Sequence, residues 1–363
     1  MKIKDLCSYA PKSRIKAGEA VENAKYLFFT SSADENKRYT DFQFDKEAII
    51  MGTGGNATLH YYNGKFSVST DCLVLFPNSK IKCKYLYYFF KSHMSVLEAG
   101  FKGAGLKHTN KKYIEEINIS KVPDLSIQEK IVSHLDTITE NIEKLNRELE
   151  LFDSITKARF IEMFGEPVNN DKGWVKDSVE RLCREIYGGG TPSKSHPEYY
   201  EGGKIPWITS KDMKTDILID SQIHINEDGV ANSTARIVPK NSVIMVIRSG
   251  ILKHTLPVAI NAVPVTVNQD LKVFVAGNRI VTKFLAYQFK MMERDILSGV
   301  RAVTADNIEF DALKRRELIV PPIELQQEFA DFVEQVDKSR EEVKKSLEKT
   351  QQLYDSLMQE YFG

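Results

Sequence analysis

The sequence predicts an α+β protein built from two copies of one unit, each a globular mixed α/β module followed by a long helix. Three observations support this prediction: an internal repeat, two heptad patterns, and short β-type runs beside one helix in each module. The expected boundaries are 1–124 for the first module, 125–165 for the first helix, 166–323 for the second module and 324–363 for the second helix. We expect the helices to pair as an antiparallel coiled coil, with a pseudo-twofold relation between the copies.

The repeat is clearest when the two halves are compared from their ends backwards. Segments 84–91 (KYLYYFFK) and 283–290 (KFLAYQFK) share five of eight residues at an offset of 199, and Asp71 and Asp270 have the same offset. At Cys7 and Cys183 the offset is 176, so the first module is about 23 residues shorter between its cysteine and Asp71 than the second module is between the matching residues. The matches at an offset of 198 are Val122-Pro123 with Val320-Pro321, Gln128 with Gln326, and Phe164-Gly165 with Phe362-Gly363.

Both long helices carry an apolar heptad stripe. Ser126 is the expected N-cap of the first, with Glu129 completing a capping box; Arg340 and Thr350 interrupt the stripe of the second. A polar residue in such a stripe fixes register and partner, so we expect the helices to pair with each other or with another subunit. Alternatively, each helix only lies on its own module. The candidate partner-binding residues are Ile131, Leu135, Ile138, Ile142, Leu145, Phe329, Val333, Val336, Val343 and Leu347.

Composition limits the class of protein. No run reaches the roughly 18 to 20 apolar residues of a membrane span, and the first ten residues lack the apolar core of a secretory signal, so a cytoplasmic protein is expected. The four cysteines show neither paired spacing nor metal-ligand spacing, which indicates reduced packing residues and no metal site. Lys and Arg exceed Asp and Glu in the modules (19 against 13 over 1–124, 21 against 19 over 166–323). The helices are acidic (5 against 8, and 5 against 10), a pattern that favours modules facing phosphate and helices facing protein.

In the first module, 48–51, 66–69 and 73–76 are predicted strands and 83–97 a helix; in the second, 242–247, 259–267 and 271–275 are predicted strands and 283–297 a helix. Loops rich in glycine, hydroxyl, amide and basic residues follow, at 52–56 and 102–110 in the first copy and at 248–254 and 301–304 in the second. Such loops can hold phosphates and contact base edges, although they can also be simple turns. The candidate DNA-binding residues are Thr53, Asn56, Lys65, Lys102, Lys107, His108, Asn110, Thr191, Lys194, Lys211, Arg248, Ser249, Lys253, His254 and Arg301.

The order of several short motifs resembles the specificity subunit of type I restriction-modification systems over nearly the whole chain. These motifs are GGTPS (189–193), GKIPWI (203–208), IRSG (247–250), VNQDL (267–271) and VPPIELQ (320–326). The resemblance implies two target recognition domains that each contact half of a bipartite, asymmetric site in double-stranded DNA. It also implies spacer helices that dock two methyltransferase (M) subunits and, through them, restriction/translocase (R) subunits. The first module lacks the Thr-Pro-Ser and Ile-Pro-Trp elements, so its details are less well defined.

The chain itself shows no enzyme signature. FKGAG (101–105) spells a methyltransferase cofactor loop but follows a helix instead of a strand, and its counterpart lacks both glycines. GGGTPSKS (188–195) has Ser193 where a phosphate-binding loop needs its last glycine. His60, His108 and His254 have no evident partner. We therefore assign no catalytic residue, cofactor, metal or membrane contact, and the competing hypothesis is a coiled-coil adaptor whose two modules bind protein.

Overall fold

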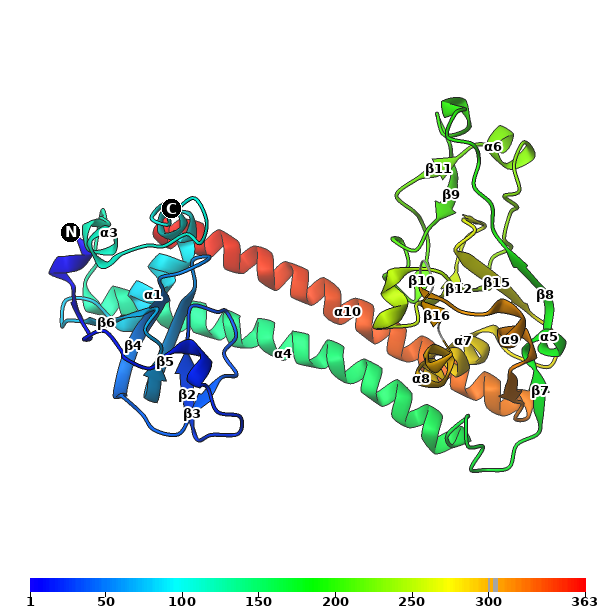
Figure 1. Ribbon diagram of the computed structural model, residues 1–363, viewed down its shortest axis with the longest axis horizontal. Helices are drawn as coiled ribbons and strands as arrows, with labels where there is room; N and C mark the ends of the chain where they lie inside the picture. The colour runs from blue at the N-terminus through cyan, green and yellow to red at the C-terminus, as the bar shows by residue number, and fades with distance from the viewer. Residues whose placement is uncertain (300, 303–305) are drawn as a thin grey trace. The chain divides into compact units, whose positions relative to one another are not determined.

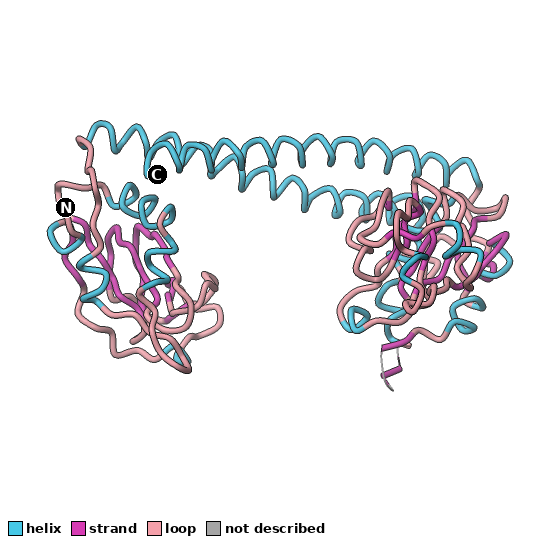
Figure 2. The backbone as a smooth tube through the Cα atoms, turned by 90° about the horizontal axis from the view of Figure 1, so that it is seen from above, coloured by secondary structure: helices cyan, strands magenta, loops and turns pink. Residues whose placement is uncertain are grey.

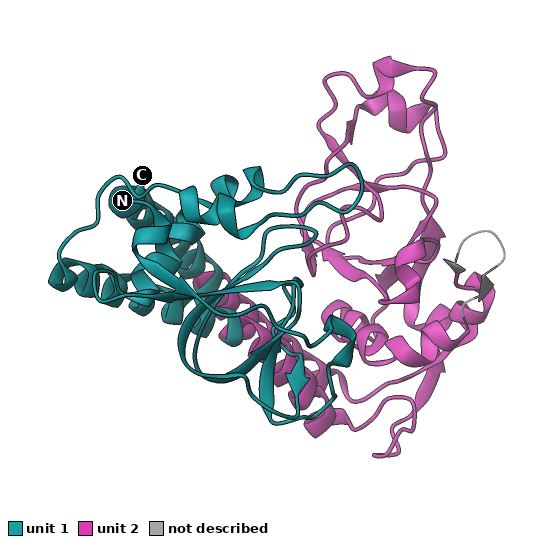
Figure 3. Ribbon diagram, turned by 60° about the vertical axis from the view of Figure 1, so that its left-hand side comes forward, with its two compact units in different colours: residues 1–147, 343–363 teal, residues 148–342 magenta. Residues whose placement is uncertain are grey.

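The computed structural model describes every residue except 300 and 303–305. The chain forms two compact units, residues 1–147 with 343–363, and residues 148–342 (Figure 3). Two unbroken 40-residue helices, α4 (Leu125–Phe164) and α10 (Ile323–Phe362), each contribute one part to each unit (Figure 2). The first of these helices begins at Leu125, so Ser126 lies inside it and the predicted N-cap is wrong. Instead Asp124 precedes the helix, and its main-chain oxygen accepts from the amides of Ile127 and Gln128.

The first module is a six-stranded sheet of order β1-β6-β4-β5-β2-β3, antiparallel except for the parallel pair β2 and β5. Helix α1 lies across β4, β5 and β6 (Figure 1). Its buried aromatic residues cover the apolar strand positions. The elements are η1 (Ile3–Asp5), β1 (Cys7–Tyr9), η2 (Ala17–Glu19), β2 (Tyr26–Phe29), β3 (Arg38–Tyr39), β4 (Phe44–Gly52), β5 (Leu59–Val68), β6 (Cys72–Pro77), α1 (Cys83–Ser92), α2 (Met94–Ala99) and α3 (Lys111–Glu116).

The second module has a five-stranded sheet of order β10-β13-β12-β15-β8 and a small sheet of order β11-β9-β14. Strands β7 and β18 form a third sheet of two strands, and β16 and β17 form a fourth. The elements are β7 (Lys176–Ser178), α5 (Val179–Leu182), β8 (Cys183–Gly188), η3 (Pro197–Tyr199), β9 (Ile205–Ile208), β10 (Ile217–Leu218), β11 (His224–Ile225), α6 (Glu227–Ala231), β12 (Val243–Val246), η4 (Gly250–Lys253), β13 (Val258–Asn261), β14 (Thr266–Val267), β15 (Leu271–Ala276), α7 (Thr282–Met291), α8 (Glu293–Ser298), β16 (Arg301–Ala302), β17 (Asp306–Asn307), α9 (Phe310–Arg315) and β18 (Glu317–Ile319).

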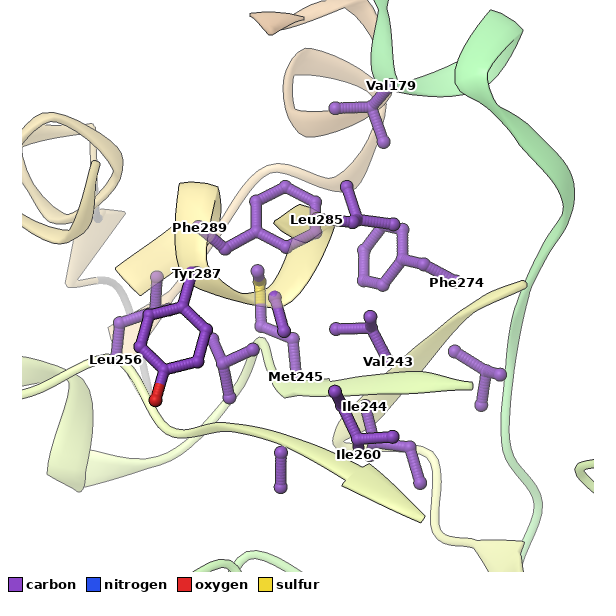
Figure 4. Close-up of a cluster of buried hydrophobic side chains, with 14 of the residues drawn as sticks. Val179, Val243, Ile244, Met245, Leu256, Ile260, Phe274, Leu285, Tyr287 and Phe289 are labelled. Atoms are coloured by element: carbon purple, nitrogen blue, oxygen red, sulfur yellow. The ribbon is translucent and has the colours of Figure 1, made fainter. Parts of the chain in front are cut away.

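The core of the second module lies between α7 and the larger sheet. Figure 4 shows Met245 of β12 and Phe274 of β15 grouped with Leu285 and Phe289 of α7. Burying such apolar side chains is the main favourable contribution to folding. The elements from β9 to α6 occupy the part of the chain in which the second module is longer, and Trp207 and Ile225 form a separate small core there.

The mixed α+β class and the two-unit repeat predicted from sequence are confirmed, but three predicted elements are wrong. Residues 259–267 were expected to form one strand, yet β13 and β14 belong to different sheets. A turn at Ala262 to Pro264 separates them, and proline there removes a backbone donor. Each predicted module helix is two helices, because the chain leaves helical geometry at His93 (ψ 37°) in the first module and at Met292 (ψ 10°) in the second.

A buried glutamine explains one of the repeat's matches. The Gln128 side chain accepts from the amide of Lys82 at 2.8 Å and donates to the carbonyls of Lys80 and Pro123 at 3.2 and 2.7 Å. Gln326 does the same in the second unit, with the amide of Val281 and with the carbonyls of Arg279 and Pro321, at 2.9, 3.2 and 2.8 Å. Both side chains are fully buried. Each therefore joins the start of a long helix to a loop that precedes a module helix, α1 in the first module and α7 in the second.

The aromatic residue at the end of each long helix explains another match. In the second unit Phe164, at the end of α4, packs on Phe284 of α7 with ring centroids 4.8 Å apart. In the first unit Phe362, at the end of α10, packs on Tyr85 of α1 at 5.2 Å. Tyr85 and Phe284 are matched residues of the repeat. Each module is thus covered by the start of one long helix and the end of the other, which makes the helices antiparallel in each unit.

Candidate nucleic-acid interface and helix contacts

Two loops of the first module lie together. The amide of Thr109 donates to the carbonyl of Thr53 at 3.0 Å, and the amide of Gly55 donates to that of Lys107 at 2.9 Å. Gly54 and His108 form a backbone bridge, and a Cβ on Gly54 would lie 3.2 Å from the His108 ring. Gly55 adopts φ +84°, a backbone conformation that favours glycine. The loops 52–56 and 102–109, which are far apart in sequence, therefore form one surface, which we call the first loop pair.

The second module repeats this arrangement with other residues. The amide of Ile308 donates to the carbonyl of Ile247 at 2.8 Å, and Arg248 forms a backbone bridge with Asn307. The amide of Ile247 donates to the carbonyl of Asp270 at 2.9 Å, as Thr53 does to Asp71 at 2.8 Å in the first module. Residues 247–250 and 307–308 form the second loop pair. Within each module, main-chain bonds therefore hold together two loops, and these loops come from the same parts of the two modules.

The first loop pair exposes four of the predicted DNA-binding side chains, Asn56, Lys102, Lys107 and His108. Two predicted residues have structural partners instead. The hydroxyl of Thr53 donates to the carbonyl of Asp71 at 3.0 Å, and Asn110 caps α3 by accepting from the amide of Tyr113 at 3.0 Å.

Lys65 does not join the first loop pair. It lies opposite Asp45 in the β4–β5 ladder, at the far end from the 52–58 connection, which adjoins the Met51 and Leu59 pair. Its ammonium is 3.9 Å from the Asp45 carboxylate and 4.7 Å above the Phe42 ring. The strand register therefore separates Lys65 from the other predicted residues of its module.

In the second module, Arg248 donates through Nε to an oxygen of Asp270 at 2.7 Å. The hydroxyl of Ser249 accepts from the amide of Ile251 at 3.4 Å and so caps η4. Lys253 and His254 follow in and after η4 and are exposed. The side chain of Arg301, like all of Val303 and Thr304, lies outside the described residues.

The glycine-rich segment 188–191 also reaches this edge of the second module. The amide of Gly190 donates to the carbonyl of Val267 at 3.0 Å, and the hydroxyl of Thr191 donates to the side chain of Gln269. A Cβ on Gly189 would lie 2.0 Å from the Val267 carbonyl, so only glycine fits there. Lys194 is exposed on the same loop, and Lys211 is exposed after β9, with its amide 3.3 Å from the hydroxyl of Thr209.

Sequence reasoning missed three residues beside the second loop pair, namely Gln269, Lys272 and Lys314. Gln269 belongs to the VNQDL motif, which could have indicated it, but Lys272 was only a strand residue. Its ammonium and that of Lys314 lie 4.7 and 4.6 Å from the ring of Phe310. Burial, then the nearby Arg248 and Lys314 cations, lowers the pKa of Lys272. Lys272 therefore adds positive charge at this edge beyond what the loops alone carry, whereas Lys314 is paired with the Asp311 carboxylate at 2.9 Å.

The predicted partner-binding side chains are largely used inside the chain. Ile131, Leu135, Leu145, Phe329, Val333 and Val336 are buried, while Ile138, Ile142, Val343 and Leu347 are partly buried. Burial leaves the first six no surface for another subunit, so the stripe joins the helices to each other and to the modules. Apolar residues that the two helices do expose are Leu125, Ile127, Leu151, Ile155, Ile323 and Leu353.

Ion pairs cross between the helices in the second unit. Arg340, which interrupts the stripe, lies 2.6 Å from the Asp153 carboxylate, and Arg159 lies 2.9 Å from that of Glu328. Thr350, in the first unit, turns its hydroxyl to the carbonyl of Ser346 at 2.7 Å. Arg340 therefore has a charged partner on the other helix, whereas the Thr350 hydroxyl forms its hydrogen bond within its own helix.

Among the described residues, no three His, Cys, Asp or Glu side chains gather as metal ligands, and no helix has the length and apolarity to cross a membrane. The four cysteines are buried and form no disulfide bond. His60 does have a partner, contrary to the expectation from sequence: its Nδ1 lies 2.9 Å from the Glu35 carboxylate. It is buried beside the Phe29 ring, so it is a packing residue with one polar contact.

Known proteins resemble this chain in sequence and in fold. The EcoR124I/EcoR124II specificity subunit of Escherichia coli is 28% identical over 316 residues, which cover 83% of this chain and 76% of that protein. The MjaIX specificity subunit of Methanocaldococcus jannaschii is 32% identical over 199 residues, which cover 53% of this chain and 44% of that protein. A crystal structure of the type I restriction-modification S subunit from M. genitalium matches with a TM-score of 0.70 at 16% identity, covering 99% of this chain and 94% of that one.

The family model for the type I restriction modification DNA specificity domain matches residues 1–151 and 172–352, which together include both modules and most of both long helices. With this match over most of its length, the chain belongs to the family of type I restriction-modification DNA specificity proteins.

Proposed function

We propose that the chain recognises a bipartite, asymmetric site in double-stranded DNA, with the first module (1–124) contacting one half and the second (166–323) the other. The recurrence of the loop pair at matched positions supports this most strongly. The first pair exposes Lys102, Lys107 and His108, whereas the second carries Arg248. Two loop pairs with the same backbone arrangement but different side chains suit two half-sites of different sequence.

The chain is then a non-catalytic subunit in the cytoplasm, and methyl transfer belongs to its partners. We propose that two methyltransferase subunits dock on the helices, and restriction subunits through them. Two copies of one partner need two equivalent surfaces. Exposed apolar residues recur at matched positions, as Leu125 with Ile323 and as Ile155 with Leu353. Leu125 and Leu353 belong to the first unit, and Ile155 and Ile323 to the second, so each unit offers one such pair.

DNA binding tests the first part of the proposal. With the methyltransferase partners present, affinity for duplex DNA should fall with salt at a logarithmic slope near −0.9 per phosphate neutralised. Methylome sequencing of cells with and without the chain should then give one motif in two separated parts. Absence of any salt-dependent binding would overturn the proposal in favour of the adaptor hypothesis, in which both modules bind protein.

Partner stoichiometry tests the second part. Ile155→Asp or Leu353→Asp should each lower the number of bound methyltransferase subunits from two towards one, because an exposed apolar contact becomes charged. Leu151→Asp is the control, since Leu151 is equally exposed but is matched by Lys349 in the repeat. Mass measurement of the assembled complex distinguishes the outcomes. Two bound subunits with every variant would place the docking surface elsewhere.

A further inference from the structure

The Arg248 guanidinium is held from one side. Its Nε and Nη2 lie 2.7 and 2.6 Å from the same oxygen, Oδ1 of Asp270. A guanidinium has a side edge formed by Nε and Nη2 and an end edge formed by Nη1 and Nη2. Since Asp270 occupies the side edge, the two parallel donors of the end edge stay available. No residue with a described side chain accepts a hydrogen bond from Nη1.

Asp270 is itself fixed by its neighbours. Its second carboxylate oxygen accepts from the side-chain amide of Asn268 at 3.0 Å, and its own main-chain amide donates to the side-chain oxygen of Asn268 at 3.1 Å. Its carbonyl accepts from the amides of Ile247 and Arg248 at 2.9 and 3.3 Å. The Asp270 side chain is 26% exposed and that of Arg248 is 48% exposed. The acidic partner is therefore anchored in the second loop pair while the arginine reaches solvent.

Two parallel N–H donors match the O6 and N7 acceptors of guanine in the major groove. A backbone phosphate also accepts from arginine, but the Asp270 carboxylate beside the guanidinium would repel it and leaves the pair without net charge. The Lys272 ammonium, which lies over the Phe310 ring, provides positive charge nearby that suits phosphate better. The local charges therefore favour a base edge as the ligand of Arg248.

We propose that Arg248 recognises the guanine of a G·C pair in the half-site of the second module and that Asp270 is its positioning residue. This inference rests on the proposed function. It adds the base that is recognised and the residue, Asp270, that orients Arg248. The first module has no such pair at the matched place. Asp71 meets Ser31 and Thr53 there through its main-chain carbonyl.

The test uses the full complex with its methyltransferase partners and measures binding to duplexes in which each base pair of the motif is changed in turn. Arg248→Ala should reduce discrimination at one G·C pair of one half-site by roughly five- to 150-fold. Arg248→Lys should lose a similar part of that discrimination while keeping the salt dependence, because an ammonium lacks the planar fork. Asp270→Asn should weaken discrimination at the same pair only, by about three- to tenfold, because one carboxylate charge no longer holds the guanidinium. Asp71→Asn is the matched control and should leave the base preferences of both half-sites unchanged.

Different results overturn different statements. If the wild-type complex shows no salt-dependent binding, the proposed function itself fails. If it binds a bipartite motif but Arg248→Ala weakens binding equally for every base change, with a salt slope smaller by about one phosphate, Arg248 is a phosphate contact and only the present inference fails. The inference also fails if Asp270→Asn and Asp71→Asn behave alike, or if neither half-site contains a G·C pair that depends on Arg248.

Discussion

Gln128→Ala and Gln326→Ala should each loosen one unit and leave the other unchanged. Each substitution removes three hydrogen bonds inside a fully buried site and leaves one amide and two carbonyls without a partner. At roughly 0.5 to 1.5 kcal/mol for each bond, local stability should fall by about 2 to 4 kcal/mol. That corresponds to about 30- to 700-fold faster exchange of amides protected by the local structure.

Hydrogen exchange followed by peptide mass measurement tests this prediction. Gln128→Ala should raise exchange around 80–84 and 123–131, and Gln326→Ala around 279–283 and 321–329. Gln327→Ala is the control, because Gln327 is exposed and bonds only to Asp331, one turn further along α10, at 2.8 Å. Equal exchange in Gln326→Ala and Gln327→Ala would show that the buried bonds do not hold the helix to its module. Faster exchange in both units from either single substitution would refute their independence.

Three further predictions concern the helices and the cysteines. Inserting one helical turn, about 5.4 Å, into both long helices should change the gap between half-sites by roughly one to two base pairs without changing the sequence of either half-site. Methylome sequencing would measure this gap. An unchanged gap would exclude the helices as the spacer. Arg340→Ala should lower unfolding stability by about 0.5 to 1 kcal/mol, because it removes the contact with Asp153 across the helix pair. The loss should shrink at high salt, and a salt-independent loss would indicate packing instead. A thiol reagent at pH 8 should label the cysteines of the native chain only slowly and those of the unfolded chain completely. The reason is burial, which raises the pKa of Cys72 to about 11 and the pKa of Cys7 and Cys183 to about 12. Rapid labelling of the native chain would contradict this burial.

The sequence predicted the periodic and repeated features well. Matches such as Gln128 with Gln326 proved to be equivalent buried contacts, and in the first module loops chosen only for their composition came together. Composition could not show that Thr53 and Asn110 use their polar atoms for the main chain, because a side chain that caps a helix looks the same in sequence as one that binds DNA.

Other differences arose because a pattern specifies which side chains are buried but not what covers them. The heptad stripe was expected to pair the helices with each other or with another subunit, and candidate partner-binding residues such as Leu135 and Val333 are covered by the chain's own modules and helices. Likewise, Lys65 was chosen for its charge, and only the β4–β5 register shows that it lies at the opposite end of the hairpin from the first loop pair. Strand register is a tertiary property that local composition does not carry.

The loop pairs separate what the repeat keeps from what it changes. The retained contacts are main-chain bonds, such as Thr109 to Thr53 and Ile308 to Ile247, which form whatever the side chain is. At the bridged positions, Gly54 and His108 of the first module correspond to Arg248 and Asn307 of the second. A frame built from backbone groups lets side chains at these positions vary without loss of the fold, since the bonds do not depend on them. We infer that the two modules can recognise different sequences because the duplication preserved the bonds that hold the loops and left their exposed side chains free to diverge.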